Sequence, residues 1–237
     1  MPEQMINILI TGARQLNISL SEDQAKILIA YKNVLLKKNA EINLTAVTND
    51  REFIIKHLLD SLTVAVLPEL SGLIADVGTG GGFPGAVIAV YRPDCAVTMI
   101  DSTEKKIRAT SELCKECGIN ARFLFGRAEE LGRTVEYREQ FDTVVARAVS
   151  ALPKLLEYCL PLVAKGGHFI AMKGPEADAE LMQSKRAIVE LGGVVKEVRT
   201  VVLPNKAKRN LVIINKERAT SNDYPRHNKR IQSFPLG

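Results

Sequence analysis

The 237-residue sequence has no run of eighteen consecutive apolar residues, whereas a membrane-spanning helix needs about twenty. Its first ten residues include Glu3 and lack the basic flank and small-residue cleavage site of a signal peptide. Cysteine is scarce: Cys114 and Cys117 form one CxxC, but no second pair completes a zinc site. These absences predict a cytoplasmic protein with reduced thiols, no bound metal and no membrane segment.

The composition suits one large domain with at most a small appendage, since 46% of the residues are apolar. The charge is unevenly placed. From residue 196 to the end there are ten Lys or Arg and three acids, a net charge of +7, whereas the whole chain carries +5. A basic end on a nearly neutral body predicts a polyanionic partner; the alternative is a solvated tail that only keeps the protein soluble.

Helical patterns fill the first sixty or so residues. Ser21 with Gln24 is typical of a capping box, and Asn49 with Glu52 predicts a second helix start. From Leu73 onward, strand-like and helix-like runs alternate, which predicts a parallel sheet covered by helices on both faces. The predicted strands cover residues 73–77, 96–100, 121–125, 141–146, 167–172, 194–203 and 210–215. The predicted helices cover residues 84–91, 103–117, 153–164 and 176–191.

The last two predicted strands are joined by only six residues, 204–209. Because so short a loop makes a hairpin and not a parallel crossover, we expect the last strand to run antiparallel. The chain divides into an N-terminal helical extension packed on the core (1–66), a core domain (67–216) and a basic tail (217–237). The tail is polar and contains proline, so we expect it to be loosely ordered.

The segment from Asp76 to Gly85, DVGTGGGFPG, is the most informative part of the sequence. It follows a predicted strand and leads into a predicted helix. Its glycines allow the backbone to approach a ligand closely and to adopt positive φ. Asp101 ends the next predicted strand, where a ribose diol would be held. The pattern indicates a cofactor that carries adenosine.

Two cofactor classes fit such a turn. Gly80 to Gly85 satisfies GxGxxG, which alone is a weak sign of a nicotinamide dehydrogenase. Against it, Asp76 would repel an approaching diphosphate, and the sixth position counted from Gly78 is Phe83. A P-loop kinase is excluded because GxxxxGK[ST] is missing. S-adenosylmethionine bears an ammonium and a sulfonium but no phosphate, so an acid beside the turn favours this cofactor.

With this turn the chain resembles the Rossmann-like (class I) methyltransferases, an α/β class whose seven-stranded, mostly parallel sheet has an antiparallel last strand. Further blocks make it similar to the bacterial family once called glucose-inhibited division protein B, the small-subunit rRNA guanine-N7 methyltransferases. These blocks are Asn43–Ala46, His57–Ser61, Asp76–Gly85, Gly126–Glu129, Ala146–Val149, Lys173–Gly174, Tyr224–Arg226 and Pro235–Leu236. Ala109 and Thr110 depart from the more apolar pair that is usual in that family.

The resemblance implies S-adenosylmethionine-dependent methylation of N7 of guanine 527, in the 530 loop of 16S rRNA, on naked rRNA or on the small ribosomal subunit. Together with the glycine turn, it implies these cofactor-binding residues: Asp76, Gly78, Gly80, Phe83, Asp101, Ala128, Glu129 and Arg147. Without the resemblance, Glu129 is equally well explained as an acid at a helix start. The expected RNA contacts are Lys173, Lys206, Lys208, Arg209, Arg226, Lys229 and Arg230.

Methylation of guanine N7 needs no general base, because its in-plane lone pair is available at neutral pH, and we assign none. The sequence lacks the Asn/Asp-Pro-Pro-aromatic element of amine-directed enzymes and the Pro-Cys element of carbon-5 enzymes after the predicted fourth strand. Arg147, which ends that strand, is the candidate for positioning the guanine; its alternative role is an ion pair with a nearby carboxylate. For His57 we prefer a packing role to contact with cofactor or RNA.

Two other functions stay open at this point. An NAD-dependent oxidoreductase would be protected from heat unfolding by NAD(H) and not by S-adenosylmethionine. An RNA-binding assembly factor would keep the fold without catalysing transfer. The intact glycine turn and its two carboxylates argue against this second alternative.

Overall fold

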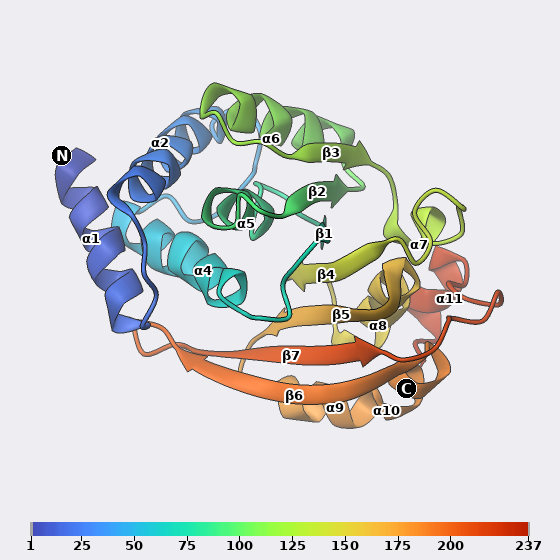
Figure 1. Cartoon of the computed structure of the whole chain (residues 1–237). Coiled ribbons are helices and arrows are strands. Elements are labelled where there is room, and N and C mark those ends of the chain that lie inside the picture. Colours follow the sequence, from blue (N-terminus) through green and yellow to red (C-terminus); the bar gives the residue numbers. More distant parts are fainter. Residues whose placement is uncertain (1, 237) are drawn as a thin grey trace.

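One seven-stranded sheet forms the centre of the protein (Figure 1), and the computed structural model describes residues 2–236. The strands are β1 (Leu73–Val77), β2 (Ala96–Asp101), β3 (Arg122–Phe125), β4 (Phe141–Arg147), β5 (Val163–Lys173), β6 (Gly193–Val202) and β7 (Lys208–Lys216). Their order is β3-β2-β1-β4-β5-β7-β6. Strands β1 to β5 pair in parallel, and β7 is antiparallel to both of its neighbours. The predicted α/β fold with an antiparallel last strand is confirmed.

Helices cover both faces of this sheet (Figure 1). One side carries α1 (Pro2–Gln15), α2 (Glu22–Lys38), α3 (Asp50–Phe53), the π-helix η1 (Ile54–Leu59), α4 (Asp60–Ala65), α5 (Gly85–Tyr91) and α6 (Glu104–Glu116). The other carries α7 (Ala128–Leu131), α8 (Leu152–Cys159), the 3-10 turn η2 (Leu160–Leu162), α9 (Ala177–Gln183), α10 (Lys185–Glu190) and α11 (Asn228–Ser233). Within residues 2–236, no helix is both long and apolar enough to cross a bilayer.

Strand β4 shows how the sheet serves two hydrophobic cores. Val145 packs into the core shared with α1 to α6, whereas Val144 and Ala146 pack into the core shared with α8, α10 and α11. Successive side chains of a strand point to opposite faces, so a strand covered on both faces must be apolar at consecutive positions. This accounts for the unbroken apolar run at residues 144–146, all of which are fully buried.

The N-terminal helices begin where the capping patterns predict. Ser21 Oγ accepts from Gln24 N (3.1 Å) while Gln24 Oε1 accepts from Ser21 N (3.0 Å), which is a complete capping box. Asn49 Oδ1 accepts from Glu52 N (3.0 Å) at the start of α3. The π-helical turn η1 that follows was not predicted, because no sequence pattern distinguishes one wide helical turn from an α-helix.

Two predicted helices differ from the observed ones. The helix predicted at residues 153–164 ends at Cys159, because Pro161 has no N–H to continue the ladder, and β5 begins already at Val163. The helix predicted at 176–191 is interrupted at Ser184, which separates α9 from α10. The Ser184 hydroxyl donates to the Glu180 carbonyl (2.7 Å), a back-bond that bends helices.

The prediction that the C-terminal tail is loosely ordered is wrong. Arg226 donates from its main-chain N and its guanidinium to Glu157 of α8, whose side chain is fully buried. Further along the tail, Ile231 and Leu236 are buried in the core under α8. The tail lies beside α8 and α10 in Figure 1. Because the tail is mostly polar, its composition gives no sign of these few buried contacts.

We predict that Arg226→Ala lowers the free energy of unfolding by about 3 kcal/mol, because it leaves a buried carboxylate without its partner. Urea denaturation of the full chain measures this. Arg230→Ala, at an exposed position of α11, is the control and should stay within about 0.5 kcal/mol of the wild type. Equal denaturation midpoints for all three proteins would contradict the anchoring role of Arg226.

Candidate functional site

A buried carboxylate holds the glycine-rich turn between β1 and α5. Asp76 is fully buried, and its Oδ2 accepts from Thr79 Oγ1 (2.6 Å) and from Gly85 N (2.8 Å). Its other oxygen, Oδ1, is buried and has no hydrogen-bond partner among the described residues. Burial raises the pKa of Asp76 to about 6, although both hydrogen bonds and the charge of Arg147 oppose the rise. Burial thus moves the titration of Asp76 toward neutral pH.

The turn itself is tied to the end of β2. Asp101 Oδ2 accepts from Gly80 N (2.9 Å), and Oδ1 accepts from Thr103 N (2.8 Å). Gly78 has φ +73°, and a Cβ there would meet Val149 Cγ2 at 2.5 Å. Only glycine suits this position, because a side chain would be strained by the left-handed backbone and would also clash. The carboxyl ends of β1, β2 and β4 are thus drawn together at one edge of the sheet.

A cavity of about 190 Å³, here called the glycine-turn cavity, opens at this edge. Four predicted cofactor residues line it: Gly78, Asp101, Ala128 and Glu129. Asp76 and Gly80 do not line it but hold its turn from behind. Three further lining residues, Tyr158, Asn228 and Gln232, were not predicted. They come from α8 and from the tail, and no local pattern marks them.

Phe83 and Arg147, also predicted to contact the cofactor, lie outside the glycine-turn cavity. The Phe83 ring stacks on His57, with centroids 4.8 Å apart and planes within 7°. Tyr31 and Phe53 meet the same ring edge-on, and the Arg147 guanidinium lies 5.5 Å from its centroid. Phe83 therefore joins the glycine turn to the N-terminal helices, and its ring also contacts Arg147.

Arg147 faces a second cavity, of about 410 Å³, which we call the arginine cavity. Its polar lining is Lys56, His57, Asp60, Arg147, Lys173, Glu180 and Arg209. The segment after β4 separates the two cavities, because Ala148 lines the arginine cavity while Val149 lines the glycine-turn cavity. A molecule in one cavity is thus separated from a molecule in the other by only this short segment.

Three acceptors hold the Arg147 guanidinium. Nη1 donates to the Lys56 carbonyl (2.9 Å) and to Asp60 Oδ2 (3.1 Å), and Nη2 donates to His57 Nδ1 (3.0 Å). The other Asp60 oxygen accepts from Arg209 Nε (3.1 Å), so one buried carboxylate joins two arginines. The ion pair that we considered as the alternative role of Arg147 is present. It also orients this side chain at the cavity.

His57 is held in its neutral form by its contacts. An arginine can only donate, so Nδ1 accepts from Arg147, and Nε2 lies 2.7 Å from the Thr45 hydroxyl. Burial, followed by the charges of Arg147 and Lys56, lowers the pKa of His57 to about 3. These contacts agree with the packing role that we preferred for His57.

The seven basic residues predicted to contact RNA fall into two groups. Lys173, Arg209 and Arg226 form ion pairs with Glu180, Asp60 and Glu157 inside the protein. The other four are exposed and form no ion pair within the described part of the chain: Lys206, Lys208, Lys229 and Arg230. The predicted patch is therefore smaller than the sequence count indicates.

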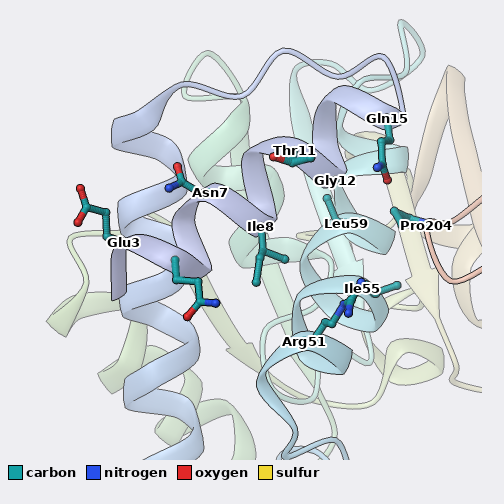
Figure 2. A pocket seen from close by; sticks show the side chains of 11 residues that line it. Glu3, Asn7, Ile8, Thr11, Gly12, Gln15, Arg51, Ile55, Leu59 and Pro204 are labelled. Atoms are coloured by element: carbon teal, nitrogen blue, oxygen red, sulfur yellow. The ribbon is translucent and has the colours of Figure 1, made fainter. Parts of the chain in front are cut away.

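A further cavity, of about 690 Å³, lies between α1, η1 and the loop after β6 (Figure 2). Asn7, Thr11 and Arg51 line it together with the apolar side chains of Ile55 and Leu59. None of the predicted site residues lines this cavity. Within residues 2–236, no group of three or more His, Cys, Asp or Glu side chains is placed to hold a metal.

Comparisons with known proteins agree with the geometry. A family model described as GidB, rRNA small subunit methyltransferase G, matches residues 24–212. The chain is 42% identical over 223 residues to ribosomal RNA small subunit methyltransferase G of Alkaliphilus metalliredigens, covering 92% of this chain and 93% of that protein. It is 41% identical to the protein of the same name from a Thermoanaerobacter species, with 100% of both chains covered.

Solved structures with lower sequence identity share the fold. A ribosomal protein L11 methylase from Lactobacillus delbrueckii subsp. bulgaricus has a TM-score of 0.53 and 15% identity, over 69% of this chain and 79% of that one. The S-adenosylmethionine-dependent methyltransferase SibL has a TM-score of 0.54 and 13% identity, over 91% of this chain and 75% of that one. The fold is that of the class I methyltransferases.

We predict that His57 makes the protein less stable as the pH falls. Unfolded His57 takes up a proton as the pH falls below its ordinary pKa of 6.5, whereas the folded protein does so only near pH 3. Between these values protons favour the unfolded chain, so stability present above pH 6.5 is lost toward pH 3. Urea denaturation should show a smaller loss between pH 7 and pH 5 for His57→Gln than for the wild type. Equal losses would mean that His57 takes up its proton in the folded protein at the same pH as in the unfolded chain.

Proposed function

Because this chain belongs to the GidB family of rRNA small subunit methyltransferases, we propose that it transfers a methyl group from S-adenosylmethionine to N7 of guanine 527, in the 530 loop of 16S rRNA. The chain is thus an S-adenosylmethionine-dependent rRNA methyltransferase, and neither an oxidoreductase nor a factor without activity. The guanine and its N7 atom are proposed from the family resemblance and from the chemistry of the site.

The observation that carries the cofactor assignment is the unpartnered oxygen of Asp76. A buried carboxylate oxygen without a donor favours a ligand that brings positive charge to the turn, and it disfavours a diphosphate. Asp101 uses one hydrogen bond on each oxygen within the protein, which leaves lone pairs for a ribose diol. S-adenosylmethionine matches both features and would supply an electrophilic methyl group.

In the proposed arrangement, Gly78, Asp101, Ala128 and Glu129 bind the cofactor at the glycine-turn cavity, and the arginine cavity receives the guanine. Arg147 has five N–H donors, and its hydrogen bonds to Lys56, Asp60 and His57 use three. The remaining donors can hold an acceptor such as guanine O6 while N7 stays unprotonated and unblocked. No side chain needs to remove a proton before transfer.

Catalysis in this proposal is therefore a matter of position. Holding two reactants in line at near-contact distance can supply roughly 7–11 kcal/mol. His57 stacks on Phe83, Phe83 contacts Arg147, and Asp60 forms an ion pair with Arg147. These contacts hold Arg147 rigidly, so that it can position the guanine. Asp76 and Gly80 complete the proposed cofactor site by holding the turn in shape.

The test is transfer of a labelled methyl group to small subunits that lack the modification, with the product nucleoside identified by mass. We predict 7-methylguanosine as the product. Asp101→Asn should raise the KM for S-adenosylmethionine roughly tenfold or more, because a charged hydrogen-bond acceptor is lost. Asp178→Asn, an exposed acid on α9, is the matched control and should behave like the wild type. A different methylated nucleoside would refute the proposed target atom.

The exposed basic residues lie at the same edge of the sheet as the arginine cavity. Asn210, two residues after Lys208, pairs with Lys173 at the end of β5, which places the β6–β7 loop at this edge. On the tail, Lys229 and Arg230 belong to α11, and two other residues of this helix, Asn228 and Gln232, line the glycine-turn cavity. RNA bound here would span both cavities.

We predict that the triple variant Lys206→Ala, Lys208→Ala, Arg230→Ala binds small subunits more weakly, with S-adenosylhomocysteine affinity unchanged. Loss of three phosphate contacts should reduce the slope of log affinity against log salt by roughly 2 to 3. Lys115→Ala with Lys165→Ala, at the opposite edge of the sheet, is the control. An unchanged salt slope in the triple variant would remove the hairpin and tail from the RNA interface.

A further inference from the structure

The C-terminal helix α11 forms one wall of the glycine-turn cavity. Asn228 and Gln232 are four residues apart on this helix, so they share one face, and both line the cavity beside Tyr158 of α8. From the sequence, this tail was expected only to contact RNA. Its position next to Glu129 and Asp101 gives it a second possible ligand.

A chain of hydrogen bonds orders these three side chains. The Tyr158 hydroxyl donates to Asn228 Oδ1 (2.9 Å) and accepts from Gln232 Nε2 (2.7 Å). Gln232 Oε1 accepts from Lys154 Nζ (2.9 Å). Within residues 2–236, no partner is recorded for Asn228 Nδ2, so the amide of Asn228 keeps two N–H donors at the cavity.

This wall is fixed before any ligand binds. Glu157, the neighbour of Tyr158, holds Arg226 two residues before Asn228, and Ile231 of the same helix is fully buried. Ordering entropy that the fold has already lost does not weaken ligand binding. A contact made by Asn228 therefore contributes to affinity without first having to immobilise the tail.

The donors and acceptors around the cavity match one part of the proposed cofactor. Adenine has a donor on its exocyclic amine and acceptors on its ring nitrogens. Glu129 offers a carboxylate acceptor, and Asn228 offers amide donors. Tyr158 lines the same cavity as Glu129, and burial, followed by the negative charge of Glu129, raises the pKa of Tyr158, so its hydroxyl stays neutral. In the proposed arrangement Asp101 binds the ribose, so α11 would contact the adenine end of the cofactor.

We propose that α11 is part of the cofactor site: the Asn228 amide donates a hydrogen bond to a ring nitrogen of the adenine, and Tyr158 and Gln232 position that amide. This inference rests on the proposed function, since it assumes that S-adenosylmethionine occupies the glycine-turn cavity. It assigns to the tail a role in binding the methyl donor in addition to any contact with RNA.

Calorimetric titration of the full chain, without RNA, tests this role. The ligands are S-adenosylhomocysteine and 5′-methylthioadenosine, which keeps the adenosine but lacks the amino-acid part. Asn228→Ala should weaken both ligands by the same factor, roughly three- to tenfold, as expected for one hydrogen bond. Ser233→Ala, an exposed change on the same helix, should bind both ligands like the wild type.

A second variant, Asn228→Asp, separates the loss of the amide donors from a loss of folding. It keeps the size of the side chain and an acceptor for Tyr158, but it replaces the amide donors with an oxygen. It should lose affinity for both ligands while unfolding near the wild-type temperature in their absence. The inference fails if Asn228→Ala and Asn228→Asp both bind like the wild type. If the wild type itself binds neither ligand, it is the cofactor assignment under the proposed function that fails.

Discussion

The site depends on one buried carboxylate beneath a turn that has almost no side chains. Asp76 binds Thr79, near the start of the glycine-rich segment, and the main chain of Gly85 at its end. With its ends held, the turn reaches Asp101 through Gly80, so β1 and β2 end at a common point. The remaining Asp76 oxygen is buried and has no donor among residues 2–236, so it lies unpaired beneath the turn.

A second carboxylate makes the N-terminal helices part of the site. Asp60 begins α4 and joins Arg147 at the end of β4 with Arg209 at the start of β7. The π-helical turn before it presents the Lys56 carbonyl and His57 to the same guanidinium. The segment 56–60 and the start of β7, which are far apart in the sequence, thus fix one side chain at the arginine cavity. The N-terminal helices are a structural component of this edge and not only a cover for the sheet.

Features encoded by neighbouring residues could be predicted from the sequence. The capping box at Ser21, the glycine turn, the strand alternation and the final hairpin each depend on residues within one short segment. Contacts between distant residues could not. Arg209 and Asp60 are 149 positions apart, and Arg226 and Glu157 are 69 apart, so the sequence shows two basic residues without showing their partners. The place of Asn228 in a cavity wall depends on such contacts and was missed for the same reason.

The strand order β5-β7-β6 has a consequence for how the protein is made. During synthesis on the ribosome, β6 emerges before β7, yet within residues 2–236 β7 is the only strand that pairs with β6. Until residues 208–216 are available, β6 has no strand to pair with, and β5 is exposed along one side. Glu157 likewise lacks its partner until Arg226, 69 positions later, has been made. The half of the sheet beyond β4 therefore reaches its native form only after residues 208–226 have emerged, whereas β1 to β4 can assemble before them.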